Sequence, residues 1–280
     1  MSDIKTPLEP PPAYEDDHKH TAANGSAAPA QGATGARGPR APLPLNLPAL
    51  NMIKGKRIIL ASASPRRRQL LAQQTIIQHG WIGLTNLEIH PSPLPEDLSH
   101  ALPPFQYVLQ TAQQKATSVY AATIDSPPEE PALVIAADTV ISTHLGEILE
   151  KPRSEREHVE MLKKLRDESG GWHKVYTAVV CMAPLDTPID PGYAMETHVE
   201  ETAVKFDQSV TDDLILSYVR TREGADKAGG YGIQGLGTIL IEKIDGTFDN
   251  VVGLPLRATL QMIEKVVIEP NVPQEVDNVL

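Results

Sequence analysis

Residues 57–71 read RIILASASPRRRQLL, and this stretch decides the fold because it joins a short apolar run directly to a helix. The run RIILAS is typical of a buried strand. Ser64 stands where it can cap the following helix, and Pro65 occupies the first helical position, where its missing N–H is not needed. A strand, a turn of small residues and a helix therefore begin the packed part of the chain.

The same turn carries an unusual charge. Helix N-termini already bear partial positive charge and usually prefer acidic residues, yet Arg66 and Arg67 stand in the first turn. An anion in front of the turn would explain them, because the hydroxyls of Ser62 and Ser64, backbone N–H groups and guanidinium groups all donate to phosphate oxygens. The alternative interpretation is a solvated basic helix start with Ser64 only as its cap.

Working outward, strands and helices follow one another without strict alternation. This mixture favours an α/β fold with a mixed, twisted sheet flanked by helices over a purely parallel sheet. The runs at 174–183 and 194–206 are joined by the turn-rich DTPIDPGY, which predicts a long hairpin. The other expected strands are near 57–62, 85–90, 132–142 and 238–244, and the expected helices are 65–74, 104–122, 154–167, 210–221 and one from about residue 254.

The chain has three parts by composition. Residues 1–50 are rich in Pro, Ala and Gly and hold one aromatic residue, so we expect a disordered arm. Residues 51–270 should form one domain, and residues 271–280 a C-terminal tail. Within the arm, Pro11-Pro12-Ala13-Tyr14 fits the PPxY pattern that WW domains bind. The alternative is an incidental match in a Pro-rich segment.

Charge and cysteine content exclude several classes of protein. The net charge of −11 argues against broad binding of nucleic acid, although a nucleotide needs only a local cluster of cations. A single cysteine, Cys181, allows no internal disulfide and suits a reducing compartment. The chain has no apolar run long enough to span a membrane and no recognisable secretory or transit segment. We therefore predict a cytoplasmic protein.

Four further groups of polar residues fall at the ends of apolar segments, where open α/β sheets tend to place their sites. Asp138 lies inside the apolar run VIAADTV, where a carboxylate is costly to bury without a metal, a proton-transfer role or a hydrogen-bonded partner. Lys115 and Lys151 could each contact a polyphosphate or be ordinary surface lysines. The segment 226–235 has four closely spaced glycines but matches neither GxGxxG nor a Walker A loop.

These segments together resemble the Maf family of nucleoside triphosphate pyrophosphatases. The resemblance runs from Lys56 to about Leu260, and its pieces occur in the family's order. They are ILASASPRRRQLL, EIHPSPLPEDL, QQKA, VIAADTVIS, ILEKP, HKVYTAVV, DKAGGYGIQGLG and DNVVGLPL. The resemblance implies a Maf/ITPase-like fold, cleavage of a nucleoside triphosphate between its α and β phosphates, and a divalent metal, Mg²⁺ or alternatively Mn²⁺.

The resemblance also assigns roles to residues. Asp138 matches the proton acceptor, and Glu96 matches the loop carboxylate that faces the metal together with Asp138. The positions around the triphosphate are matched by Ser62, Arg67, Lys115 and Lys151. The positions that mark the dTTP/UTP branch are matched by Arg66, Thr139 and Gln234.

The chemistry of these residues agrees with a uracil or thymine base. A Gln amide offers a donor and an acceptor together, which complements O4 and N3–H of those bases, and Arg offers donors only. Modified nucleotides such as 5-methyl-UTP or pseudo-UTP remain an alternative within the class. Another alternative is a regulatory or binding protein that retains the fold without catalysis and is recruited through Pro11–Tyr14. The resemblance further implies a homodimer.

Overall fold

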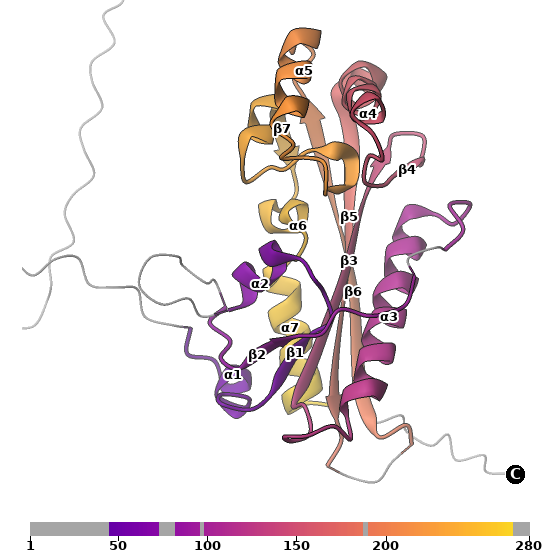
Figure 1. Ribbon diagram of the computed structural model, residues 1–280. Coiled ribbons are helices and arrows are strands. Elements are labelled where there is room, and N and C mark those ends of the chain that lie inside the picture. The colour runs from indigo at the N-terminus through magenta and orange to yellow at the C-terminus, as the bar shows by residue number, and fades with distance from the viewer. Residues whose placement is uncertain (1–44, 73–81, 96–97, 187–189, 271–280) are drawn as a thin grey trace, which may run out of the picture. The chain divides into compact units, whose positions relative to one another are not determined.

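The computed structural model describes residues 45–72, 82–95, 98–186 and 190–270 of the chain (Figure 1). Those residues form one mixed seven-stranded sheet in the order β2-β1-β3-β5-β6-β7, with β4 paired to β3. Strands β2, β1 and β3 are parallel, and the other pairs are antiparallel. The strands are β1 (Ile58–Leu60), β2 (Leu87–Ile89), β3 (Leu133–Thr143), β4 (Ile148–Leu149), β5 (Trp172–Pro184), β6 (Tyr193–Phe206) and β7 (Ile241–Asp245).

Helices cover both faces of this sheet, so the predicted fold class is confirmed. One face is covered by α3 (Pro104–Thr123), whose small and β-branched side chains pack on β3 and β5. The opposite face is covered by α7 (Leu256–Ile268), together with α1 (Pro48–Met52) and α2 (Pro65–Leu71). A third cluster lies under α4 (Glu155–Asp167) and α5 (Asp212–Arg220), near the short helix α6 (Phe248–Val252).

One stretch of β3 lacks a neighbouring strand on one side, and this gap positions the site. Strand β1 pairs only with the first part of β3, as far as Ile135, and β4 pairs with Ile141 and Ser142. Between them, within the described residues, the backbone of 136–140 pairs with β5 and with no other strand. Successive side chains of a strand point to opposite faces. At an edge with no neighbouring strand, side chains from both faces of β3 can therefore border one cavity.

Most helices and strands form where their sequence pattern predicts them. The hairpin β5–β6, helix α3 and strand β3 form close to their expected bounds. Ser64 caps α2 by accepting from the N–H of Arg67, and Ser154 caps α4 by accepting from the N–H of Glu157. Cys181 is a free, fully buried thiol in the core, as its apolar surroundings predict.

Two expected boundaries are wrong. The arm does not extend to residue 50, because Pro48–Met52 form α1 and bury Ala49 and Leu50 against the core. The Pro-rich composition of the preceding residues hides this short apolar helix. Helix α2 ends at Leu71 rather than near residue 74, because Ala72 turns into an extended conformation and forms a bridge with Leu84.

Several predictions fall outside the described residues. These include the PPAY segment Pro11–Tyr14, the rest of the expected arm up to residue 44, Glu96 and the tail 271–280. Binding of a WW domain and the disorder of the arm therefore stay predictions. In the part of the chain that the structure covers, none of the helices has the length and apolar character that crossing a membrane requires.

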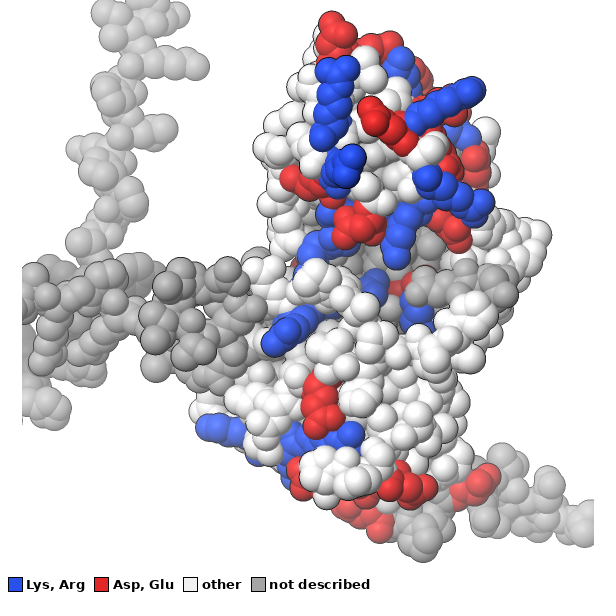
Figure 2. Space-filling model, viewed as in Figure 1, with Lys and Arg blue, Asp and Glu red and all other residues white. Residues whose placement is uncertain are grey.

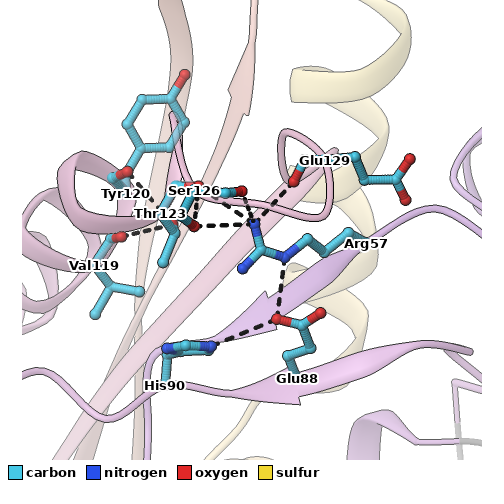
Figure 3. A network of polar contacts seen from close by, with 8 residues as sticks. All are labelled: Arg57, Glu88, His90, Val119, Tyr120, Thr123, Ser126 and Glu129. Atoms are coloured by element: carbon cyan, nitrogen blue, oxygen red, sulfur yellow. Dashed lines mark hydrogen bonds and ion pairs between the residues drawn. The ribbon is translucent and has the colours of Figure 1, made fainter.

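Arg57 ties the first strand to the loop after α3 (Figure 3). Its side chain is 5% exposed, and its Nε donates to Glu88 Oε2 at 3.0 Å. Its Nη1 donates to the carbonyl oxygens of Thr123, Ser126 and Glu129 at 3.3, 3.0 and 2.8 Å. One guanidinium thus donates to backbone carbonyls at the end of α3 and in the loop after it, and it fixes this loop to β1 and β2.

We predict that Arg57→Met lowers the free energy of unfolding by about 2–4 kcal/mol, because it removes the Arg57 donor from the partly buried carbonyls of Ser126 and Glu129 and leaves Glu88 without its cation. Urea unfolding measures this change. The matched control is Arg68→Met, which replaces an exposed arginine of α2 and should change stability by less than about 0.5 kcal/mol. Equal effects of the two substitutions would show that the Arg57 network does not stabilise the fold.

Candidate active site

A cavity of about 560 Å³ lies at the carboxyl ends of β1 and β2 and along the open edge of β3. Its lining includes the turn 61–67, Pro91 and Ser92 after β2, Lys151 after β4, and the segment 226–235. Figure 2 shows Lys and Arg side chains around the hollow between the part that carries α4 and α5 and the part that carries β1 and α2.

The cavity is positively charged although the whole chain is acidic. Among the described residues, three acidic ones line it, Asp138, Glu223 and Asp226. In the same part of the chain, five cationic residues line it: Arg66, Arg67, Lys115, Lys151 and Lys227. The net charge of the chain is −11, so this local excess of cations is a property of the site and not of the composition. Such a cavity attracts anions.

A buried ion pair lies in the cavity wall. Lys115 Nζ, from α3, donates to Asp138 Oδ1, from β3, at 2.8 Å, and the two side chains are 10% and 8% exposed. Asp138 follows the apolar run of β3 and points toward α3, as do Ala136 and Val140 on the same face. The ammonium compensates the carboxylate charge that would otherwise be costly in this wall.

Arg67 braces the opposite side of the open edge. Its guanidinium donates to three protein oxygens: Nε to Gly253 O at 2.8 Å, Nη1 to Ser62 Oγ at 3.0 Å and Nη2 to Thr139 Oγ1 at 2.9 Å. Gly253 ends α6 with φ +119, a conformation that L side chains rarely adopt, and this turn presents its carbonyl to Arg67. Arg67 is therefore buried and joins β1, β3 and the turn before α7.

The hydrogen bonds at Ser62 determine what this side chain offers to a ligand. Ser62 Oγ accepts from Arg67 Nη1 at 3.0 Å and from the backbone N–H of Ser64 at 3.2 Å. A hydroxyl has two acceptor positions and one proton. Both acceptor positions are used, and no acceptor for the proton lies among the described residues. Ser62 therefore presents a donor to the cavity.

The glycine-rich segment is held by two buried histidines. His158 of α4 donates from Nε2 to Gly230 O at 2.5 Å, since a carbonyl can only accept. His173 of β5 donates from Nδ1 to Gly171 O at 3.2 Å. In its neutral form His173 Nε2 must then accept, and it receives the hydroxyl proton of Tyr231 at 2.8 Å. Tyr231 lines the cavity, so the two rings fix one wall.

Glu223 fixes the other end of this segment. Its carboxylate accepts from the backbone N–H groups of Leu236 at 2.7 Å and Gly237 at 3.0 Å, and from the hydroxyl of Tyr218 at 3.3 Å. Partial burial raises the pKa of Glu223, but these bonds and the charge of Lys227 outweigh burial and lower it overall. The segment that carries Gln234 is thus anchored at both ends.

The structure brings together all the predicted site residues that it describes. They all line the cavity, and they are Ser62, Arg66, Arg67, Lys115, Asp138, Thr139, Lys151 and Gln234. Asp138 and Lys115 are buried, whereas Lys151 and Gln234 are exposed at the cavity surface. The remaining predicted residue, Glu96, lies outside the described residues.

Sequence reasoning missed the residues that hold the wall in place. Glu223, Thr177, Asn250 and Gly253 were not predicted to belong to the site, although each contacts a lining residue or lines the cavity. Glu223 lies in a polar turn after α5, and Asn250 is a lone buried amide in the short helix α6, so neither stands out in the sequence as part of a site. A buried threonine such as Thr177 looks like any β-branched strand residue, so only its contacts reveal it.

The groups in this cavity that could bind a metal ion are carboxylate oxygens. Among the described residues, no group of three or more His, Cys, Asp or Glu side chains is placed to hold a metal by itself. Mg²⁺ commonly binds one or two carboxylates together with waters and substrate phosphates, and it does not need a cage of protein ligands. Asp138 fits this requirement, with Glu96 as the second carboxylate that the sequence predicts.

Fold and site together define an α/β protein with a cation-lined cavity at the carboxyl ends of parallel strands. The chain belongs to the Maf family, because the family model for Maf-like protein matches residues 57–266. This confirms the resemblance seen in the sequence.

Similar proteins carry consistent names. A dTTP/UTP pyrophosphatase of Schizosaccharomyces pombe is 48% identical over 76% of this chain and 85% of its own length. A dTTP/UTP pyrophosphatase of Caldicellulosiruptor bescii is 40% identical over 75% of this chain and 94% of its own. Among solved structures, the Ham1 protein of Staphylococcus aureus aligns at 13% identity with a TM-score of 0.33 over 55% of this chain and 73% of its own.

His173 makes the stability of the fold depend on pH. Burial lowers its pKa from 6.5 to about 4, so between these values the unfolded chain binds a proton that the folded chain does not. Stability therefore falls as the pH is lowered from 6.5 to 4, by about 3 kcal/mol for this group alone. Thermal unfolding across this range measures the slope.

We expect His173→Gln to flatten that slope, because it removes the titrating group. His144→Gln, which replaces an exposed histidine, should keep the slope of the original protein. A slope that is unchanged in His173→Gln would assign the pH dependence to other groups.

Proposed function

We propose that the protein hydrolyses nucleoside triphosphates to the monophosphate and pyrophosphate, with dTTP and UTP as its substrates and a divalent metal as its cofactor. The observation that carries this proposal is the buried Asp138–Lys115 pair in the wall of a cavity with an excess of cations. A polyphosphate requires such cations, and hydrolysis requires a carboxylate beside it. The names of the relatives support the same activity and the same bases.

The cavity offers separate groups for the phosphates. Ser62 presents a donor, and phosphate oxygens only accept. Lys151 and Arg66 line the same cavity. Within the described residues neither side chain is held by a hydrogen bond or an ion pair, so both can move toward a ligand. Each charge-assisted hydrogen bond to phosphate contributes roughly 1.5–3 kcal/mol. Arg67, in contrast, acts mainly by holding Ser62 and Thr139 in place.

The reaction adds water to the α-phosphorus and breaks its bond to the bridging oxygen, which leaves with pyrophosphate. Asp138 orients this water and takes its proton. Lys115 holds the carboxylate in position and lies close enough to compensate charge that develops on the phosphates. A divalent ion held by Asp138 and Glu96 would neutralise phosphate charge when bound.

The substrate prediction is that UTP and dTTP are hydrolysed at least about tenfold more efficiently than GTP, ATP or CTP, because a site that hydrogen-bonds a base edge rejects bases that leave its groups unpaired. Pyrophosphate release from a panel of nucleotides, with Mg²⁺, with Mn²⁺ and with a chelator, is the measurement. Chelation should abolish turnover. Equal efficiency on GTP and UTP would refute the pyrimidine preference, and full activity with the chelator would refute the metal.

Asp138→Asn should lower kcat at least about 100-fold, because the amide cannot accept the proton of water. The substitution also leaves Lys115 without a charged partner, so thermal unfolding must accompany the assay. Glu88→Gln is the matched control: it likewise removes a carboxylate from a buried cation, Arg57, but lies outside the cavity. A folded Asp138→Asn protein with near-full pyrophosphate release would contradict the assignment.

A further inference from the structure

Thr139 and Thr177 lie directly opposite one another on neighbouring strands of the sheet. Thr139 belongs to β3 and Thr177 to β5, and the two residues are partners in the antiparallel register. Their hydroxyl oxygens are 2.9 Å apart. Thr139 lines the cavity, whereas Thr177 is completely buried and lies behind it. Thr177 therefore cannot contact a ligand itself, and the cavity-lining side chain that it contacts is that of Thr139.

The direction of every hydrogen bond in this group follows from the acceptor at its end. Thr177 Oγ1 is 3.0 Å from the backbone carbonyl of Asn250, and a carbonyl can only accept. The single proton of Thr177 is therefore used there. In the bond between the two threonines, the proton must come from Thr139.

The direction of the hydrogen bond at the other end of this series, between Arg67 and Thr139, is equally determined. Arg67 Nη2 donates to Thr139 Oγ1 at 2.9 Å, and a guanidinium has no acceptor. The protons thus run one way, from Arg67 to Thr139, from Thr139 to Thr177, and from Thr177 to the carbonyl of Asn250. The Thr139 hydroxyl therefore donates its proton in the hydrogen bond to Thr177, and one of its two acceptor positions is occupied by the N–H of Arg67. Only the second acceptor position is left for a ligand in the cavity.

We propose that Thr177 is a positioning residue that sets base selectivity by making Thr139 a pure acceptor. An acceptor accommodates a ligand N–H and repels a ligand lone pair. Uracil and thymine carry a proton on N3, whereas N3 of cytosine carries a lone pair. This series of hydrogen bonds therefore favours uracil and thymine over cytosine. This proposal rests on the proposed nucleotide hydrolysis.

The proposal also separates two hydroxyls in the same cavity. Ser62 is left with a proton to donate, which suits phosphate oxygens, and Thr139 is left with an acceptor, which suits a base N–H. Arg67 contacts both oxygens. One buried guanidinium thus gives the two hydroxyls opposite hydrogen-bonding characters.

The test compares kcat/KM for UTP and CTP by pyrophosphate release in the original protein, Thr177→Val and Thr177→Ser. Valine has nearly the shape of threonine but cannot accept from Thr139, so the Thr139 proton becomes able to donate to N3 of cytosine. We expect the ratio of UTP to CTP to fall about three- to tenfold in Thr177→Val, the range that one neutral hydrogen bond supports. Thr177→Ser keeps the hydroxyl and should keep the ratio within about twofold.

The ratio distinguishes positioning from general damage, because a loosened site lowers both efficiencies together. In a Thr139→Val background, the Thr177→Val substitution should no longer change the ratio, since the group it acts through is gone. A folded Thr177→Val protein with the original ratio would overturn the proposal. An original protein that hydrolyses no nucleotide would instead overturn the proposed function.

A second route covers the case in which Thr177→Val does not fold. Thr177→Ala removes the same hydroxyl with a smaller side chain and should give the same fall in the ratio. The original protein can also be assayed with UTP and with UTP methylated on N3, which lacks the base proton. Efficient hydrolysis of the methylated nucleotide would overturn the proposal without any variant.

Discussion

The site depends on the one-sided pairing of β3. Where β1 has ended and β4 has not begun, the strand bonds to β5 alone, and its free edge borders the cavity. Everything else is arranged around this edge. Helix α3 brings Lys115 to one face of β3, and the first turn of α2 brings Arg67 to the other. Without the gap, Asp138 and Thr139 would be enclosed in two separate core layers.

The cavity is built from a rigid part and a peripheral part. The rigid part consists of buried groups that bond to one another, namely the Lys115–Asp138 pair and the contacts of Arg67. The peripheral part consists of exposed side chains such as Lys151 and Gln234. Rigid groups suit the reacting bond, because catalysis requires fixed positions, and exposed groups suit the ends of a ligand that enters from solvent.

Much of this arrangement could be predicted from the sequence. Apolar runs and caps indicated β1, α2, α3, β3 and the β5–β6 hairpin, because each buries a continuous face that leaves a periodic pattern. The charged residues of the site stood out because charge is unusual at a helix start or within an apolar strand, as at Arg66 and Asp138. Helix α1 was missed because five residues after a Pro-rich segment give too little periodicity.

The contacts behind the site could not be predicted in this way. The sequence does not show whether the hydroxyl of Thr177 or the carbonyl of Asn250 has only a structural role or sets the hydrogen bonding of a neighbouring side chain. That distinction depends on the register of strands across the sheet. The role of Arg67 was likewise underdetermined. A basic residue in a helix start suggests a ligand contact, but the structure directs three of its donors to protein oxygens.

The adjacency of Asp138 and Thr139 has a consequence for how relatives of this protein can diverge. The residue proposed for proton transfer and the residue proposed for base recognition are joined by one peptide bond, in a strand that pairs with β5 from Val134 to Thr143. The backbone cannot shift one without the other. A new substrate must therefore be accommodated by exchanging side chains or by reversing the direction of a hydroxyl hydrogen bond. The backbone of β3 meanwhile keeps a constant distance between the groups that contact the phosphates and the groups that contact the base.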